Sequence, residues 1–120
     1  MVERNTAERA SDETRLTEIL KAVSDPTRRA LLTLVVQNGA MRVTDLAGHF
    51  DMSLNAVSKH IKVLEASGLV RRSTAWREHL IEADLGEVAL IDRWFADLRL
   101  IWDMRLEMLD KLLAEEPKDD

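Results

Sequence analysis

The sequence predicts a mainly α-helical protein whose elements follow the order α-α-α-α-β-β-α. Three observations lead to this fold class. Apolar residues recur with helical spacing along most of the chain, one stretch reads as a β-hairpin, and the breaks between segments carry helix caps and glycine stops. With 120 residues, of which 46% are apolar and 32% charged, the chain fits one domain with a small core.

The first two helices are expected to be separated by Ser24-Asp25-Pro26. Residues 1–12 lack apolar periodicity and are expected to form a flexible tail. Asp25 is suited to cap the second helix and Pro26 to begin it, and Asn38-Gly39 is a stop signal. The apolar face of the first helix comprises Leu16, Ile19, Leu20 and Val23. The residues expected to point inward from the second helix are Ala30, Leu31, Leu34 and Val35.

Residues 43–66 are predicted to form two short helices joined by a tight turn, which is a helix-turn-helix. The first helix runs from about Thr44 to His49. The second begins after a turn at Asp51-Met52, with Ser53 as its cap, and ends near Ala66 before Ser67-Gly68. The core-facing stripe of the second helix comprises Val57, Ile61 and Leu64.

A polar stripe without any acidic residue lies on the opposite side of this second helix. It contains Asn55, Ser58, Lys59 and Lys62. Amide, hydroxyl and ammonium groups are those that bind base edges and phosphates of DNA. In helix-turn-helix proteins the N-terminal half of the second helix enters the major groove. A solvated surface is the alternative interpretation, but the preceding turn and the basic segment that follows favour binding of double-stranded DNA.

The charge distribution supports a localised DNA-binding surface in a chain whose net charge is −5. Between residues 53 and 81 there are five basic residues and two acidic ones, whereas residues 82–120 contain five basic and twelve acidic residues. We therefore expect the DNA-binding surface to lie in the middle of the chain, while the acidic remainder limits non-specific binding.

Residues 69–82 are predicted to form a basic β-hairpin that carries Arg71, Arg72 and Arg77. Because neighbouring residues of a strand point to opposite faces, at most one of Arg71 and Arg72 can share the DNA-facing side with Arg77. The hairpin tip, Ala75-Trp76, has no glycine. Trp76 is expected to pack back against the domain, with contact to the sugar-phosphate backbone as the alternative.

A long final helix over residues 85–114 has an apolar surface wider than one stripe. Ile91, Phe95, Leu98, Trp102 and Leu109 adjoin a second stripe of Trp94, Ile101 and Met108. A helix on the surface of one domain needs a single apolar stripe, and a small domain has little mass to cover two. A second copy of the chain is therefore expected to cover the remainder, and a two-fold dimer would match a pseudo-palindromic DNA site.

Two segments together resemble the ArsR-type family of winged helix-turn-helix repressors. The first is Leu20-Lys21-Ala22-Val23-Ser24-Asp25-Pro26-Thr27-Arg28-Arg29. The second runs from Val43-Thr44-Asp45-Leu46-Ala47 through Met52-Ser53 and Ala56-Val57-Ser58-Lys59-His60-Ile61 to Ser67-Gly68-Leu69-Val70. The similarity extends over roughly Thr14 to Leu113. Arg77-Glu78-His79-Leu80-Ile81, followed by Trp94, Trp102 and Arg105, resembles a metal-independent branch of that family.

The resemblance implies a homodimer joined by the first and last helices, with residues 69–82 as the wing and residues 115–120 as a charged tail outside the domain of residues 13–114. His60 matches a position that is often basic in the family, although helix geometry allows a core-edge role equally well. The predicted DNA-binding residues are Ser53, Asn55, Ser58, Lys59, His60, Lys62, Arg72 and Arg77. The predicted dimer residues are Leu16, Ile19, Leu20, Trp94, Leu98, Ile101, Trp102 and Met108.

Several function classes are disfavoured by what the sequence lacks. The chain has no cysteine, and its final helix has acidic residues but no histidine, so neither a thiolate site nor an interhelical His/carboxylate zinc site is expected. No phosphate-binding loop or nucleophile–base pair predicts an enzyme or a cofactor. We expect a cytoplasmic regulator without membrane association. A winged helix used as a protein-interaction module, or a regulator that responds to an organic effector, stays open.

Overall fold

The computed structural model describes residues 2–115, with side chains from residue 7 onward. It consists of α1 (Val2–Ala22), α2 (Pro26–Asn38), β1 (Met41–Arg42), α3 (Val43–Ala47), α4 (Leu54–Ala66), β2 (Val70–Ala75), β3 (Glu78–Ala83) and α5 (Val88–Ala114). The element order predicted from the sequence is confirmed, with one added strand. The predicted charged tail lies, apart from Glu115, outside the described residues.

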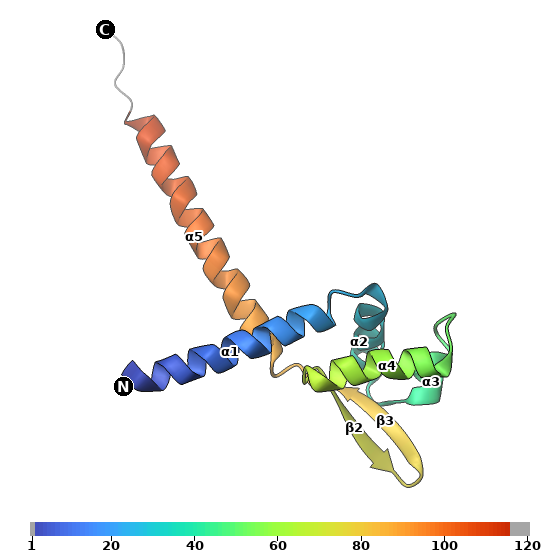
Figure 1. Ribbon diagram of the computed structural model, residues 1–120. Helices are drawn as coiled ribbons and strands as arrows, with labels where there is room; N and C mark the ends of the chain where they lie inside the picture. The colour runs from blue at the N-terminus through green and yellow to red at the C-terminus, as the bar shows by residue number, and fades with distance from the viewer. Residues whose placement is uncertain (1, 116–120) are drawn as a thin grey trace.

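The hydrophobic core is formed where α1, α2, α3 and α4 meet the small sheet (Figure 1). The predicted core stripe of the second helix of the helix-turn-helix is confirmed, because all three of its members are buried. Leu31 and Val35 of α2 are buried as expected, but Ala30 is exposed because it lies on the outer side of that helix. The largest fully buried side chains are those of Ile19, Leu31, Leu46, Ile61, Leu64, Leu69 and Ile81.

Helix α1 begins at Val2, whereas the sequence predicts a flexible tail through residue 12. Residues 2–12 contain no glycine or proline and are rich in Glu, Arg and Ala, which favour helix. High helix propensity can extend a helix beyond its packed part without adding an apolar stripe. The apolar periodicity therefore marked where α1 packs and not where it begins.

The sheet is antiparallel, with strand order β1-β3-β2. Two-residue strand β1 pairs Met41 with Ile81, and it was missed in the sequence because two residues cannot show alternation. In the hairpin, Arg72 is opposite Ile81, and both side chains therefore point to the same face of the sheet. Since Ile81 is buried, this register turns Arg72 toward the helical side of the domain.

Helix α5 projects away from the rest of the molecule after crossing α1, while the hairpin of β2 and β3 extends from the other side (Figure 1). Only the first turns of α5 pack against the core, through Val88, Leu90 and Ile91. An ion pair of 3.1 Å between Arg15 Nε and Glu87 Oε2 joins α1 to the residue that precedes α5. No residue of α5 is fully buried. Within residues 2–115, no helix has the length and apolar character needed to cross a membrane.

Candidate nucleic-acid interface

Helix α4 is held by a capped N-terminus and a buried inner face. The backbone N–H of Ala56 donates to Oγ of Ser53 at 3.1 Å, as predicted for the cap. Burial of Val57 and Ile61 fixes the rotation of the helix about its axis. The opposite side therefore faces outward, with Asn55, Lys59 and Lys62 exposed and Ser58 half-buried.

An open groove of about 400 Å³ runs between α4 and the hairpin. It brings the helix residue Ser58 next to Arg72 and Arg77 of the hairpin, which the sequence could only place on separate elements. A neighbouring hollow shares Ser58 and Arg72 and adds Asn55 and Lys62. The groove residues that sequence reasoning did not select are Arg42, Val43, Thr44, Leu54, Glu78 and His79.

Arg72 lies in the groove but is already paired. Its Nη2 and Nε donate to the two carboxylate oxygens of Glu65 at 2.8 and 3.2 Å. These hydrogen bonds raise the pKa of Arg72 above its ordinary value. The expectation that only one of the two neighbouring arginines shares the side of Arg77 is confirmed, and Arg72 is that residue. The pair shows that Arg72 offsets an acidic group on α4, which the sequence interpretation did not foresee.

Two further arginines near the hairpin are also occupied by carboxylates. Arg71 points to the outer face of the sheet and pairs with Glu82 at 3.0 Å and with Asp84 at 3.7 Å. Arg42 contacts Asp45 at 3.0 Å and Glu78 at 3.1 Å, and the hydrogen bond to Asp45 is the main cause that raises its pKa.

Lys59, Lys62 and Arg77 differ from these arginines, because within residues 7–115 none of the three has an ion-pair partner. They are the cations of this surface that are available to phosphates.

The side chain of Trp76 is exposed to solvent at the tip of the hairpin, which corrects the expectation that it packs back against the domain. It is 87% exposed and has a φ of 62°. That positive φ occurs at the first residue of a two-residue loop, a position that normally takes glycine. The loop geometry aims the ring outward, where its one aromatic contact within the described residues is with Arg77, whose guanidinium lies 5.1 Å from the ring centroid.

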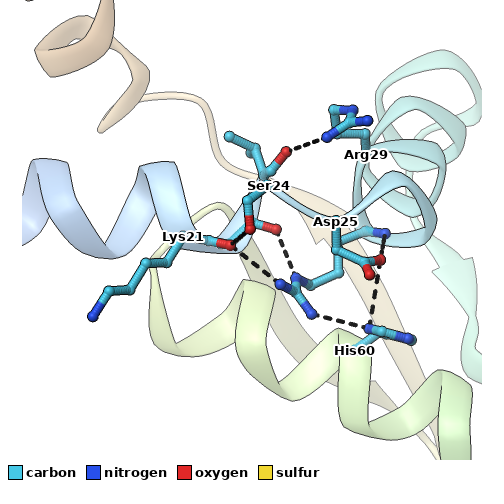
Figure 2. Close-up of polar contacts among 8 residues, drawn as sticks. Lys21, Ser24, Asp25, Arg29 and His60 are labelled. Atoms are coloured by element: carbon cyan, nitrogen blue, oxygen red, sulfur yellow. Dashed lines mark hydrogen bonds and ion pairs between the residues drawn. The ribbon is translucent and has the colours of Figure 1, made fainter.

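His60 contacts α2 and lies outside the polar stripe of α4, while its role as a DNA-binding residue stays a prediction (Figure 2). Its Nδ1 lies 3.2 Å from Nη1 of Arg28 and 3.9 Å from Oδ2 of Asp25. Arg28 also donates to the carbonyl oxygens of Lys21 and Ala22 at the end of α1. This position favours the core-edge alternative, because the ring faces the junction of three helices.

The predicted dimer residues fall into two groups. Ile19 is completely buried in the core of its own chain and is unavailable to a second copy, so its prediction is wrong. Ile19 shares one apolar stripe with Leu16 and Leu20, and at Ile19 this stripe packs against the core of its own chain. Leu16 and Leu20 are half-buried. The α5 members are all exposed, namely Trp94, Leu98, Ile101, Trp102 and Met108.

His79 and Thr44 could have been found from the sequence with one further step. His79 lies two residues before the buried Ile81 on the same strand, so alternation puts both side chains on one face. Thr44 lies in the first turn of the first helix of the helix-turn-helix. No signal in the sequence could have revealed the pairing of Arg72 with Glu65.

Comparison with known proteins places this arrangement in a family. A family model described as a helix-turn-helix domain matches residues 23–73. An HTH-type transcriptional regulator of Methanocaldococcus jannaschii is 33% identical over 69 residues, which are 56% of this chain and 78% of that protein. An ArsR-like transcriptional regulator from Rhodococcus sp. RHA1 is 30% identical, with a TM-score of 0.72 over 88% of this chain and 97% of the other. The chain belongs to the ArsR family.

Two other relatives add detail about the family. The transcriptional repressor SdpR of Bacillus subtilis is 36% identical over 55 residues, which are 46% of this ArsR-family chain and 60% of that repressor. A winged helix-turn-helix DNA-binding domain from Mycobacterium bovis, whose solution structure is homodimeric, is 25% identical, with a TM-score of 0.60 over 83% of this chain and 89% of the other. The predicted family and winged helix-turn-helix fold are confirmed.

Proposed function

We propose that this ArsR-family protein is a transcriptional repressor that binds a pseudo-palindromic operator as a homodimer. The observation that carries the proposal is the surface formed by Asn55, Ser58, Lys59, Lys62 and Arg77, which we call the reading surface. Ser58 of α4 and Arg77 of the hairpin line one groove, Asn55 and Lys62 line the neighbouring hollow with Ser58, and Lys59 is exposed on the outer side of α4.

The parts of the reading surface have different roles in this proposal. Asn55 and Ser58 lie in the N-terminal half of α4, which enters the major groove in helix-turn-helix proteins, and they read base edges. Lys59 and Lys62 neutralise phosphates. Arg77 and Trp76 at the hairpin tip contact the adjacent minor groove or backbone. Ser53 caps α4 and is placed to offer its hydroxyl to a phosphate as well.

The exposed apolar surface of α5 supports the homodimer. Ile101, Trp102 and Met108 are 63%, 59% and 65% exposed, which is costly for large apolar side chains in water. The chain has a radius of gyration of 21.3 Å, against about 14 Å for a compact chain of this length. A second copy seated along α5 would bury this surface and place two α4 helices about a two-fold axis, which is the symmetry of a pseudo-palindrome. SdpR is a repressor, which favours the same role here.

Operator selection followed by salt-dependent binding tests the proposal. DNA fragments recovered from cells with the protein supply the operator. Asn55→Ala and Ser58→Ala should then reduce the preference for operator over unrelated DNA. Lys62→Ala should weaken binding to both kinds of DNA alike, and it should lower the salt slope, which is the slope of log affinity against log salt concentration, by about one. If all three variants bind as the native protein does, the reading surface is wrong. If the native protein retains a protein partner and no DNA, the function is protein interaction.

The dimer is tested separately by Ile101→Glu, which places a charge in the exposed apolar surface. We expect a monomer in sedimentation and loss of operator binding, because each half-site alone provides too few contacts. Persistence of the dimer would refute the role of α5.

A further inference from the structure

One charged side chain lies in the middle of the apolar face of α5. At 100° per residue, the apolar side chains of α5 that face one side occupy an arc of about 160°, and Arg105 lies near its centre. Its neighbours one turn before are Ile101 and Trp102, and its neighbours one turn after are Met108 and Leu109. All four are exposed and apolar.

The surroundings of Arg105 differ from those of the other arginines of α5. Arg93 is four residues before Asp97, and Arg99 is four residues before Asp103, a spacing that favours ion pairs on a helix surface, although within residues 88–114 neither arginine forms one in the structure. Arg105 has no carboxylate at any such position. Within residues 7–115 it makes no ion pair or hydrogen bond through its side chain. This guanidinium is therefore satisfied by water alone.

The proposed dimer removes that water. Burial of an apolar face around a guanidinium without an acceptor is strongly unfavourable, because the charge loses its hydration. An apolar face built only for packing would carry a leucine at this position. The second copy must therefore supply a carboxylate to Arg105 if α5 forms the interface.

We propose that Arg105 forms an ion pair with Asp97 of the second copy, on each side of the two-fold axis. This inference rests on the proposed homodimer. In an antiparallel pair of α5 helices centred between Ile101 and Trp102, position 105 is opposite position 98 of the second copy. Asp97 is the next residue, about 1.5 Å away along the helix axis.

The same register is favoured by the apolar residues and by the position of Asp97. It pairs Ile91 with Leu112, Trp94 with Leu109 and Phe95 with Met108, so that apolar side chains meet apolar side chains. Asp97 lies at the border of the apolar arc and lines a hollow together with Trp94 and Leu16. Centring the helices two residues later would oppose Arg105 to Trp102, which offers a ring face but no hydrogen-bond acceptor. Charge complementarity thus selects the register with Asp97.

A charge exchange in the full-length protein tests the pair. Arg105→Asp and Asp97→Arg should each raise the dimer dissociation constant about tenfold or more, because each places like charges together. The double variant should return it to within about threefold of the native value, since the pair is restored with reversed polarity. Asp103→Arg, which makes the same charge change on the opposite side of α5, is the matched control and should leave dimerisation unchanged.

The outcomes separate this inference from the proposed function. A dimeric native protein whose double variant stays as weak as the singles overturns the ion pair and leaves the dimer standing. A monomeric native protein overturns both.

A second measurement stays informative if the charge variants fail to fold. The chain has no cysteine, so Ile101→Cys introduces one thiol next to the proposed axis and should form an interchain disulfide on oxidation. Leu109→Cys is on the same face, but in this register position 109 lies roughly 20 Å from position 109 of the second copy. This variant should therefore form no interchain disulfide. The reverse pattern would overturn the register and the ion pair with it.

Discussion

Arg72 of β2 and Glu65 of α4 form a two-point ion pair, with donor–acceptor distances of 2.8 and 3.2 Å. Planar pairing of a guanidinium with both oxygens of a carboxylate fixes the orientation of both side chains. The pair therefore ties the hairpin to α4, and it cancels the one acidic group that lines the hollow next to Lys62. We therefore expect this interaction within the protein to limit the strength of DNA binding.

Glu65→Gln should tighten DNA binding because it removes that acid and frees Arg72 for a phosphate. We expect the affinity to rise several-fold at low salt and the slope of log affinity against log salt to steepen by about one. Binding measured at several salt concentrations gives both values. The matched control is Glu82→Gln, which removes the shorter of the two carboxylate contacts of Arg71 on the outer face of the hairpin and leaves the one with Asp84. Equal responses in the two variants would contradict the assigned orientation.

His60→Ala should destabilise the fold without changing how the folded protein reads DNA. The variant removes the ring that lies 3.2 Å from the guanidinium of Arg28, and loss of one such contact costs about 1 kcal/mol. Thermal unfolding should show the loss, while the salt slope of operator binding stays at the native value. Lys62→Ala should show the opposite pattern, with a reduced salt slope and an unchanged melting temperature. A reduced salt slope in the His60 variant would instead support the prediction that this residue binds DNA.

Acidification should weaken the start of α2 through Asp25. The backbone N–H of Arg28 donates to its carboxylate at 3.0 Å and is the main cause that lowers the pKa of Asp25 from 3.8. Because the folded pKa lies below the unfolded one, the stabilisation is complete above about pH 4 and is lost as the pH falls through the folded pKa.

Asp25→Asn keeps an oxygen for the cap but does not titrate in this range. The melting temperature of the native protein should therefore fall more between about pH 5 and about pH 2.5 than that of the variant. Parallel curves for the two proteins would show that Asp25 has no part in the acid response.

Trp76→Gly should stabilise the hairpin and weaken DNA binding at once. A left-handed backbone costs a residue with a side chain roughly 1–2 kcal/mol, and glycine avoids this cost. The lost ring removes contact area at the tip of the hairpin. Trp76→Ala is the control, since it also lacks the ring but keeps the strain. We expect both variants to bind the operator more weakly and only the glycine variant to melt higher; native affinity in both would exclude Trp76 from the DNA contact.

Much of the helical part of the fold could be predicted from the sequence because its signals are local. Ser53 caps α4 as expected, and Val57, Ile61 and Leu64 form the buried face. The start of α1 and strand β1 could not be predicted in the same way. The first depends on propensity without packing, and the second depends on pairing with residues about forty positions away.

The candidate site shows the same division. Asn55, Ser58, Lys59 and Lys62 share one side of a helix, and a spacing of three or four residues is sufficient to establish that. His60 is on the same helix, but its environment is provided by α2 and the end of α1. Trp76 depends on a backbone angle that residue type did not indicate, since tryptophan rarely adopts it.

The sequence by itself determined the helix-turn-helix, the acid-free side of α4 and the surplus apolar surface of α5, because helical periodicity and capping are properties of neighbouring residues. The tertiary structure alone decided which basic residues remain available. Arg42, Arg71 and Arg72 are paired with carboxylates, whereas Lys59, Lys62 and Arg77 have no carboxylate partner among the side chains of residues 7–115. Ion pairs between elements depend on distances in space, and no pattern along a chain records whether a guanidinium has already found its carboxylate.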